Sequence, residues 1–175
     1  MVDTTDNSNI CILLVDDDQM VRRSVAAYLD DCGYEVVQAC DGLEALALLD
    51  QINPQLVITD LKMPKLDGIS LLKRIEPLER DIPVIVMSGA GAMEDAVEAL
   101  RSGASDYLFK PIVDFRLLKH AIKRIVERKK LQQQNARYRE ALERANSELK
   151  ETLKALEQDQ QAGRQLQLKL FPQAD

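Results

Sequence analysis

The chain has 175 residues, of which 46% are hydrophobic and 30% are charged, and this suits one ordinary domain with a helical appendage. The formal net charge of −6 argues against a nucleic-acid-binding surface, because such surfaces are basic. No apolar run reaches about 18 residues and the first nine residues are polar, so we expect a cytoplasmic protein that has no signal peptide and does not contact membranes.

Short apolar runs alternate with helical patterns over residues 10–127, which we expect to form one domain after a disordered start at residues 1–9. Parallel strands need crossover connections, so the alternation predicts an α/β fold with a parallel sheet and helices on both faces. The expected strands are 10–15, 34–39, 56–59, 84–87 and 106–109. The expected helices are 19–31, 42–50, 68–76, 93–102 and a last one that begins near residue 114.

Two of these helices have an apolar side that we expect to pack on the sheet. In the helix over residues 93–102, Ala96, Val97 and Leu100 are the expected inward side chains. In the last helix the expected inward side chains are Leu117, Leu118, Ala121, Ile122 and Ile125.

The helical pattern of the last helix continues without Gly or Pro from Phe115 to Gly163, too far for an ordinary globular helix. We therefore expect a helical linker at 128–162 and, at 163–175, the start of a connection to an output domain. A solvated helix is one interpretation. We favour a parallel homodimeric coiled coil, because a helix that is polar on nearly all sides is seldom stable alone. Its heptad-compatible positions are Asn135, which would fix the register, and Tyr138, Leu142, Ala145, Leu149 and Leu156.

Polar residues stand at the carboxyl ends of four expected strands. Asp16 and Asp17 follow the first strand, and Asp60, Ser88 and Lys110 follow the third, fourth and fifth. Clustered carboxylates repel one another unless a cation neutralises them, and all-oxygen ligation suits Mg²⁺. A lysine and a hydroxyl opposite the metal suit a phosphoryl group, which makes Asp60 a candidate nucleophile. Each residue alone could be a cap or a solvated side chain, but their joint placement favours a site.

Four stretches carry a family resemblance: VDDD at 15–18, TDLKMPKLDG at 59–68, MSGAG at 87–91 and DYLFKP at 106–111. Over roughly residues 10–125 the chain resembles the receiver (CheY-like) domain of two-component response regulators. The resemblance implies a flavodoxin-like, five-stranded parallel sheet in the order 2-1-3-4-5.

The resemblance also implies roles for the residues at the strand ends. Asp60 would be the phosphoacceptor, and Asp17 and Asp60 would ligate Mg²⁺ directly, with Asp16 acting largely through water. The backbone carbonyl of Lys62 would complete the protein ligands. The phosphoryl group would come from a sensor histidine kinase or a phosphotransfer protein.

Two further residues would bind the phosphoryl oxygens, Ser88 and Lys110, and the Lys110–Pro111 peptide resembles the cis bond of the family. Ser88 and Tyr107 would form the switch, the hydroxyl moving inward and the tyrosine ring following it. Tyr107 could instead be a plain buried aromatic. We expect slow self-dephosphorylation, because neither Lys62 nor Ala90 offers a group that would orient an attacking water.

Residues 162–172 are similar to the segment before stress-response serine/threonine phosphatase domains. With the receiver, they resemble RssB-type regulators of the general stress sigma factor, which implies a sigma factor or anti-sigma protein as a possible partner. We expect no enzyme activity of this chain beyond self-phosphorylation and slow dephosphorylation, any phosphatase domain being absent from it. The alternatives are a phosphorylation-independent adaptor, and a haloacid-dehalogenase-like phosphatase that would use Asp16 and Asp18.

Overall fold

The computed structural model describes residues 10–76, 81–89 and 93–170. They fall into two compact units that meet between Glu127 and Arg128. The strands are β1 (Cys11–Val15), β2 (Glu35–Ala39), β3 (Leu56–Asp60), β4 (Val84–Gly89) and β5 (Asp106–Lys110). The helices are α1 (Gln19–Asp31), α2 (Gly42–Ile52), α3 (Gly68–Ile75), α4 (Met93–Arg101) and α5 (Phe115–Leu170).

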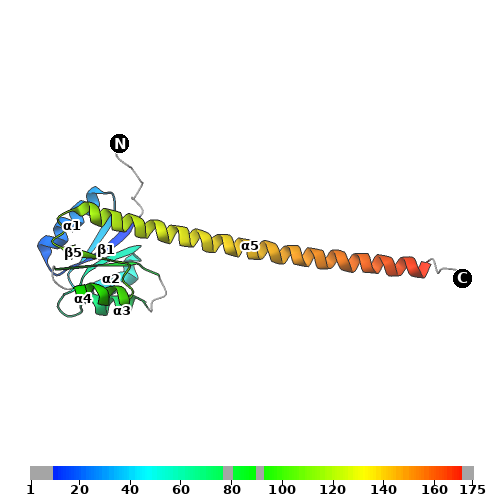
Figure 1. Cartoon of the computed structure of the whole chain (residues 1–175), viewed down its shortest axis with the longest axis horizontal. Coiled ribbons are helices and arrows are strands. Elements are labelled where there is room, and N and C mark those ends of the chain that lie inside the picture. Colours follow the sequence, from blue (N-terminus) through cyan, green and yellow to red (C-terminus); the bar gives the residue numbers. More distant parts are fainter. Residues whose placement is uncertain (1–9, 77–80, 90–92, 171–175) are drawn as a thin grey trace. The chain divides into compact units, whose positions relative to one another are not determined.

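The first unit is a five-stranded sheet in the order β2-β1-β3-β4-β5, and every neighbouring pair is parallel. Helices α2, α3 and α4 cover one face, and α1 with the first part of α5 covers the other (Figure 1). The predicted fold class, strand order and long C-terminal helix are therefore confirmed. The continuous apolar runs of β1, β3 and β4 follow from this arrangement, because both faces of these strands are buried.

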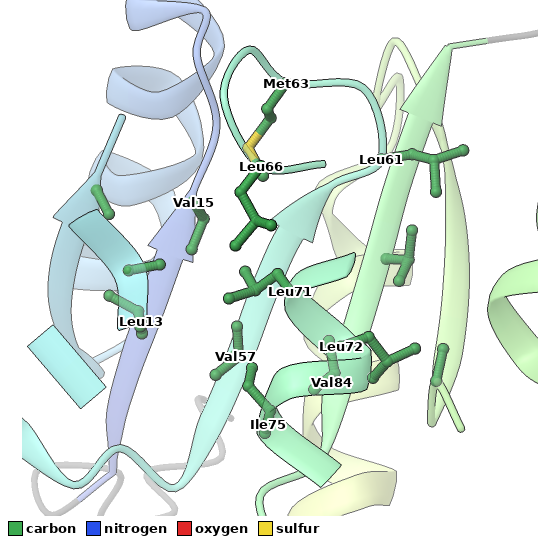
Figure 2. Close-up of a cluster of buried hydrophobic side chains, with 14 of the residues drawn as sticks. Leu13, Val15, Val57, Leu61, Met63, Leu66, Leu71, Leu72, Ile75 and Val84 are labelled. Atoms are coloured by element: carbon green, nitrogen blue, oxygen red, sulfur yellow. The ribbon is translucent and has the colours of Figure 1, made fainter. Parts of the chain in front are cut away.

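Two hydrophobic clusters hold the helices to the sheet, one on each face. On the α2–α3–α4 face, Met63 and Leu66 from the loop after β3 join Val15 of β1 and Leu71 of α3 (Figure 2). On the other face, Leu118 of α5 is fully buried among residues of α1 and the central strands. Each such side chain contributes about 1.5–3 kcal/mol by leaving water.

The predicted inward faces of α4 and α5 are wrong at three positions. Val97 is 41% exposed, Leu100 is 50% exposed and Leu117 is 61% exposed. The residues of α4 that are buried are Ala96 and Ala99, three positions apart and therefore on the same side of the helix. The small side chains of α4 are therefore the ones that pack into the core, whereas the larger apolar ones stay partly exposed.

The second unit consists of the rest of α5. The helix runs through Gly163, where the sequence predicted its end, and reaches Leu170. From Lys130 to Arg164 every side chain is exposed. No helix of the described residues is both long and apolar enough to cross a membrane, because α5 carries charges throughout its length.

Candidate functional site

Three carboxylates meet at the carboxyl edge of the sheet. Asp16 and Asp17 directly follow β1, and Asp60 is the last residue of β3, which pairs with β1 in parallel. Asp16 is completely buried, Asp60 is 8% exposed and Asp17 is exposed. One carboxylate oxygen of each lies within 4.8 Å of the others. The fold thus concentrates negative charge in one partly solvent-accessible place.

Lys110, the last residue of β5, reaches this cluster with its ammonium group. Its Nζ lies 2.6 Å from Asp16 Oδ2 and 3.1 Å from Asp60 Oδ2. Burial acts to lower the pKa of Lys110, but the hydrogen bonds and charges of Asp16 and Asp60 outweigh it and raise the pKa. The lysine is therefore held in its charged form between the two carboxylates. The Lys110–Pro111 peptide bond that follows is cis, as predicted.

Backbone amides also satisfy the buried carboxylates. The Leu61 N–H donates to Asp60 Oδ1 at 2.7 Å, and the Asp18 N–H donates to Asp16 Oδ1 at 3.0 Å. Burial nevertheless raises the pKa of Asp16, and the nearby charge of Asp60 adds to the effect, while Lys110 acts against it. A second cation beside Asp16 and Asp60 would favour their charged forms.

The donor set fits a hard divalent cation, because all three side chains offer carboxylate oxygens and no sulfur or imidazole lies among them. The sequence predicts that this cation is Mg²⁺. The predicted fourth protein ligand is the carbonyl of Lys62, two residues after Asp60. The Lys62 side chain is 77% exposed and pairs with Asp95 of α4, Nζ to Oδ2, at 3.3 Å.

Ser88 and Tyr107 lie on neighbouring strands. Ser88 is 2% exposed and follows Met87, the register partner of Asp60. Tyr107 pairs with Val86, two residues before Ser88, so both side chains belong to the sheet face covered by α2, α3 and α4. The Tyr107 hydroxyl is buried and has no hydrogen-bond partner among the described residues.

The predicted linker residues lie on the second unit, where all of them are exposed. The apolar ones with the largest exposure are Tyr138 at 74%, Leu142 at 64%, Leu149 at 57% and Leu156 at 54%. The sequence pattern did not single out Leu153, which is 51% exposed and extends the same apolar side of the helix. Its spacing of four from Leu149 and three from Leu156 could have identified it.

Comparison with known families identifies one match. A model described as "Response regulator receiver domain" matches residues 12–123, more than half of the chain. Among solved structures, a response regulator receiver domain protein from Clostridium thermocellum is 35% identical, with a TM-score of 0.66, and the match covers 70% of this chain and 98% of that one.

Curated relatives are named as regulators of transcription. The "DNA-binding dual master transcriptional regulator RpaA" of Synechocystis sp. is 41% identical over 102 residues, which is 57% of this chain and 42% of the relative. The "C4-dicarboxylate transport transcriptional regulatory protein DctD" of Rhizobium meliloti is 35% identical over 138 residues, 79% of this chain and 30% of the relative. The chain thus matches less than half the length of these relatives.

Proposed function

Because the chain belongs to the response regulator receiver family, we propose that it is a phosphorylation-controlled switch whose phosphoacceptor is Asp60. The donor would be a phosphohistidine on a sensor kinase or phosphotransfer protein. The observation that carries the proposal is the position of Lys110, whose ammonium lies 2.6 Å from Asp16 and 3.1 Å from Asp60 in a cluster of three carboxylates. The proposed nucleophile, the Lys110 ammonium and the proposed metal ligands then lie together at the carboxyl edge of the sheet.

In the proposed transfer, a carboxylate oxygen of Asp60 attacks the phosphorus atom and the bond from phosphorus to the histidine nitrogen breaks. Charge spreads over the three remaining phosphoryl oxygens. Lys110 and the hydroxyl of Ser88 would donate to two of these oxygens. Asp16, Asp17, Asp60 and the carbonyl of Lys62 would hold Mg²⁺, which when bound would offset the rest of the charge.

The proposed readout passes through Ser88 and Tyr107. A phosphoryl oxygen at Asp60 would draw the Ser88 hydroxyl toward it, and the tyrosine ring would follow into the vacated space. The support is that the two residues share one face of neighbouring strands, and that the Tyr107 hydroxyl is buried without a partner among the described residues. Phosphorylation would then shift the balance between two arrangements of β4, β5 and α4.

Intact-mass measurement after incubation with acetyl phosphate tests the proposal. The protein should gain one phosphoryl group in the presence of Mg²⁺ and none with EDTA, and Asp60→Asn should abolish the gain. Asp67→Asn is the matched control, because Asp67 is an exposed aspartate seven residues further on whose capping role an asparagine can take over. Labelling that persists in Asp60→Asn would contradict the proposal.

The alternatives predict different results. A haloacid-dehalogenase-like phosphatase would be labelled at Asp16 with help from Asp18. The Asp18 carboxylate instead caps α1, accepting from the N–H groups of Met20 and Val21. A phosphorylation-independent adaptor would still bind its partner when Asp60 is replaced by Ala. In the proposed switch, the same substitution would abolish the response to acetyl phosphate.

Slow self-dephosphorylation is a second part of the proposal. The Lys62 ammonium pairs with Asp95 at 3.3 Å and cannot act as a base that activates water. Ala90, the other residue on which the prediction depends, lies outside the described residues. Lys62→Asn should shorten the lifetime of the acyl phosphate, measured as loss of the added mass after the donor is removed. Lys119→Asn, an exchange of the same kind on α5, should leave the lifetime unchanged, and a wild-type lifetime of seconds would contradict the proposal.

The helical unit is proposed to form a parallel homodimer that relays the switch to an output domain. The exposed residues Leu142, Leu149 and Leu156 support this, since their apolar surface faces water in a single chain. The relatives are named as transcriptional regulators, so an output that acts on transcription fits them, and a link to a general stress sigma factor stays a prediction. Sedimentation equilibrium tests the dimer, and a monomer at tens of micromolar would contradict it.

A further inference from the structure

The loop between β3 and α3 leads directly from Asp60 to the proposed metal carbonyl of Lys62. It has no helix or strand structure of its own, yet three of its residues, Leu61, Met63 and Leu66, are at most 9% exposed. Their side chains join the cluster on the α2–α3–α4 face of the sheet (Figure 2). The packing of these side chains in the cluster therefore fixes one side of the loop. A carbonyl that points at a metal also needs a fixed backbone, which packing of side chains alone does not set.

Lys65, in the middle of this loop, pairs with Asp41, the residue that directly precedes α2. The lysine Nζ donates to Asp41 Oδ2. The other oxygen, Oδ1, accepts from the N–H groups of Leu43 at 3.0 Å and Glu44 at 2.9 Å, so Asp41 also caps α2. Asp41 is 3% exposed and held by these contacts, and it gives the lysine a rigid partner. The hydrogen bond from Lys65 lowers the pKa of Asp41, which keeps the carboxylate charged.

The backbone of Lys65 has φ of 66°, in the left-handed region that residues with a Cβ rarely adopt. A glycine or asparagine would hold this conformation more easily. The lysine is kept there while its side chain is paired, so the ion pair and the unusual backbone conformation occur at the same residue. The pair is thus a candidate for what holds the turn.

The neighbouring residues bring the same two segments into direct contact. A Cβ placed on Gly42 would lie 2.6 Å from the backbone oxygen of Leu66, so the start of α2 and the loop touch along their backbones. At the far end of the loop, the Gly68 N–H donates to Leu61 O at 2.9 Å, and a Cβ on Gly68 would overlap the backbone oxygen of Asp60. The end of the loop next to α3 is therefore held against fixed backbone, and the Gly68–Leu61 hydrogen bond ties the two ends of the loop together.

The strand that precedes Asp41, β2, is tied to the acidic cluster as well. Ala39, the last residue of β2, pairs in register with Val15, and its oxygen accepts from the Asp16 N–H at 3.2 Å. The segment 39–42 therefore contacts the residue after β1 through Ala39, and the β3–α3 loop through Asp41 and Gly42. A contact that fixes the loop to this segment fixes it relative to Asp16.

We infer that the Asp41–Lys65 ion pair is a positioning contact for the metal site: it holds the β3–α3 loop so that Lys62 presents its carbonyl beside Asp16, Asp17 and Asp60. The inference rests on the proposed function, which supplies the metal. Neither residue of the pair touches the metal in this assignment. Their effect is on how tightly a divalent cation binds.

Calorimetric titration of the unphosphorylated full chain with Mg²⁺ tests the inference. Asp41→Asn removes the lysine's partner but keeps an oxygen for the cap, and Lys65→Gly removes the ammonium while easing the backbone at positive φ. Each should weaken Mg²⁺ binding by about tenfold, as loss of a contact behind the ligands commonly does. The double variant should be no weaker than either single variant, because both remove the same contact. Lys65→Arg should bind Mg²⁺ nearly as the wild type does.

A second measurement separates positioning from a general loss of stability. Hydrogen exchange at the Leu66 and Gly68 amides should speed up in Asp41→Asn and Lys65→Gly, while the amides of β1 and β3 keep their wild-type rates. Unchanged Mg²⁺ affinity in both single variants, or weakening that adds up in the double variant, would overturn the inference and leave the proposed function intact. If the wild type binds no Mg²⁺, the proposed metal site is wrong and the inference falls with it.

Discussion

Leu118 and Leu149 belong to the same 56-residue helix, α5, but they have opposite surroundings. Leu118 is completely buried against the sheet in the first unit, and Leu149 is 57% exposed in the second. The first unit has two hydrophobic clusters of its own, whereas the side chains from Lys130 to Arg164 are all exposed. Residue type and helix are the same, so the difference comes from what covers each leucine.

The two units differ in the packing that they offer to α5. Forming the first turn of a helix is unfavourable, and in proteins most of the stability of a helix comes from the packing of its apolar face. The first unit supplies that packing to residues 115–127. The second unit has an apolar side without a cover in the single chain, so its cover is expected to come from a second copy.

The largest expected effect is on the stability of the first unit. Leu118→Ala should lower the free energy of unfolding by about 2–5 kcal/mol, because it leaves a cavity in a packed core. Leu149→Ala should change it by less than about 0.5 kcal/mol, as an exposed substitution does. Urea unfolding followed by near-ultraviolet circular dichroism, at a concentration where the chain is monomeric, measures both. Equal losses would mean that the two leucines are not covered differently.

For the association of two chains, replacing Leu149 should have a larger effect than replacing Leu118. In the proposed dimer each Leu149→Ala substitution is present twice, so the dissociation constant should rise by at least about tenfold, or about 1.4 kcal/mol. Lys150→Ala, an exposed neighbour outside the a and d positions, is the matched control and should leave the constant near the wild-type value. Sedimentation equilibrium measures both variants, and a Leu149→Ala chain that associates like the wild type would place the dimer contact elsewhere.

The same contrast explains which features could be predicted from the sequence. The strands were predictable because β1, β3 and β4 each contain an uninterrupted apolar run, and a residue at a strand end must lie at the edge of the sheet. The inward face of α4 was predictable only at Ala96, because periodicity also ranks Val97 and Leu100 as apolar, while the fold leaves these two partly exposed and buries the smaller Ala99. Apolar periodicity indicates which side of a helix is hydrophobic, but not which side chains on that side are buried.

The pair formed by Asp41 and Lys65 was equally invisible in the sequence. The two residues are 24 positions apart on different loops, and no periodic pattern relates them. Their contact depends on the parallel pairing of β1 with both β2 and β3, which brings the ends of β2 and β3 near each other. The carboxylates at the strand ends were easier to predict. Each follows its own strand, and the carboxyl ends of parallel strands lie at the same edge of the sheet.

The smallest expected effect concerns charge: the first unit buries the Asp41 carboxylate, whereas the charged side chains from Lys130 to Arg164 are all exposed. The lysine partner lowers the pKa of Asp41 in the folded chain. Because the folded state then binds the proton less tightly than the unfolded state, the pair stabilises the fold above the ordinary aspartate pKa of about 3.9. That stabilisation should be lost as the pH falls through the lowered pKa. The free-energy difference between wild type and Asp41→Asn, from urea unfolding in EDTA, should therefore shrink on acidification.

The matched control for this titration is the same comparison in a Lys65→Gly background. Without the ammonium, the Asp41→Asn substitution removes only the charge on the cap, so the pH-dependent part of the difference should become smaller. A difference that stays constant from neutral to acid pH in both backgrounds would mean that the Asp41–Lys65 pair does not stabilise the first unit. An equal pH dependence in both backgrounds would instead assign the effect to the cap of α2, where Asp41 accepts from the Leu43 and Glu44 amides.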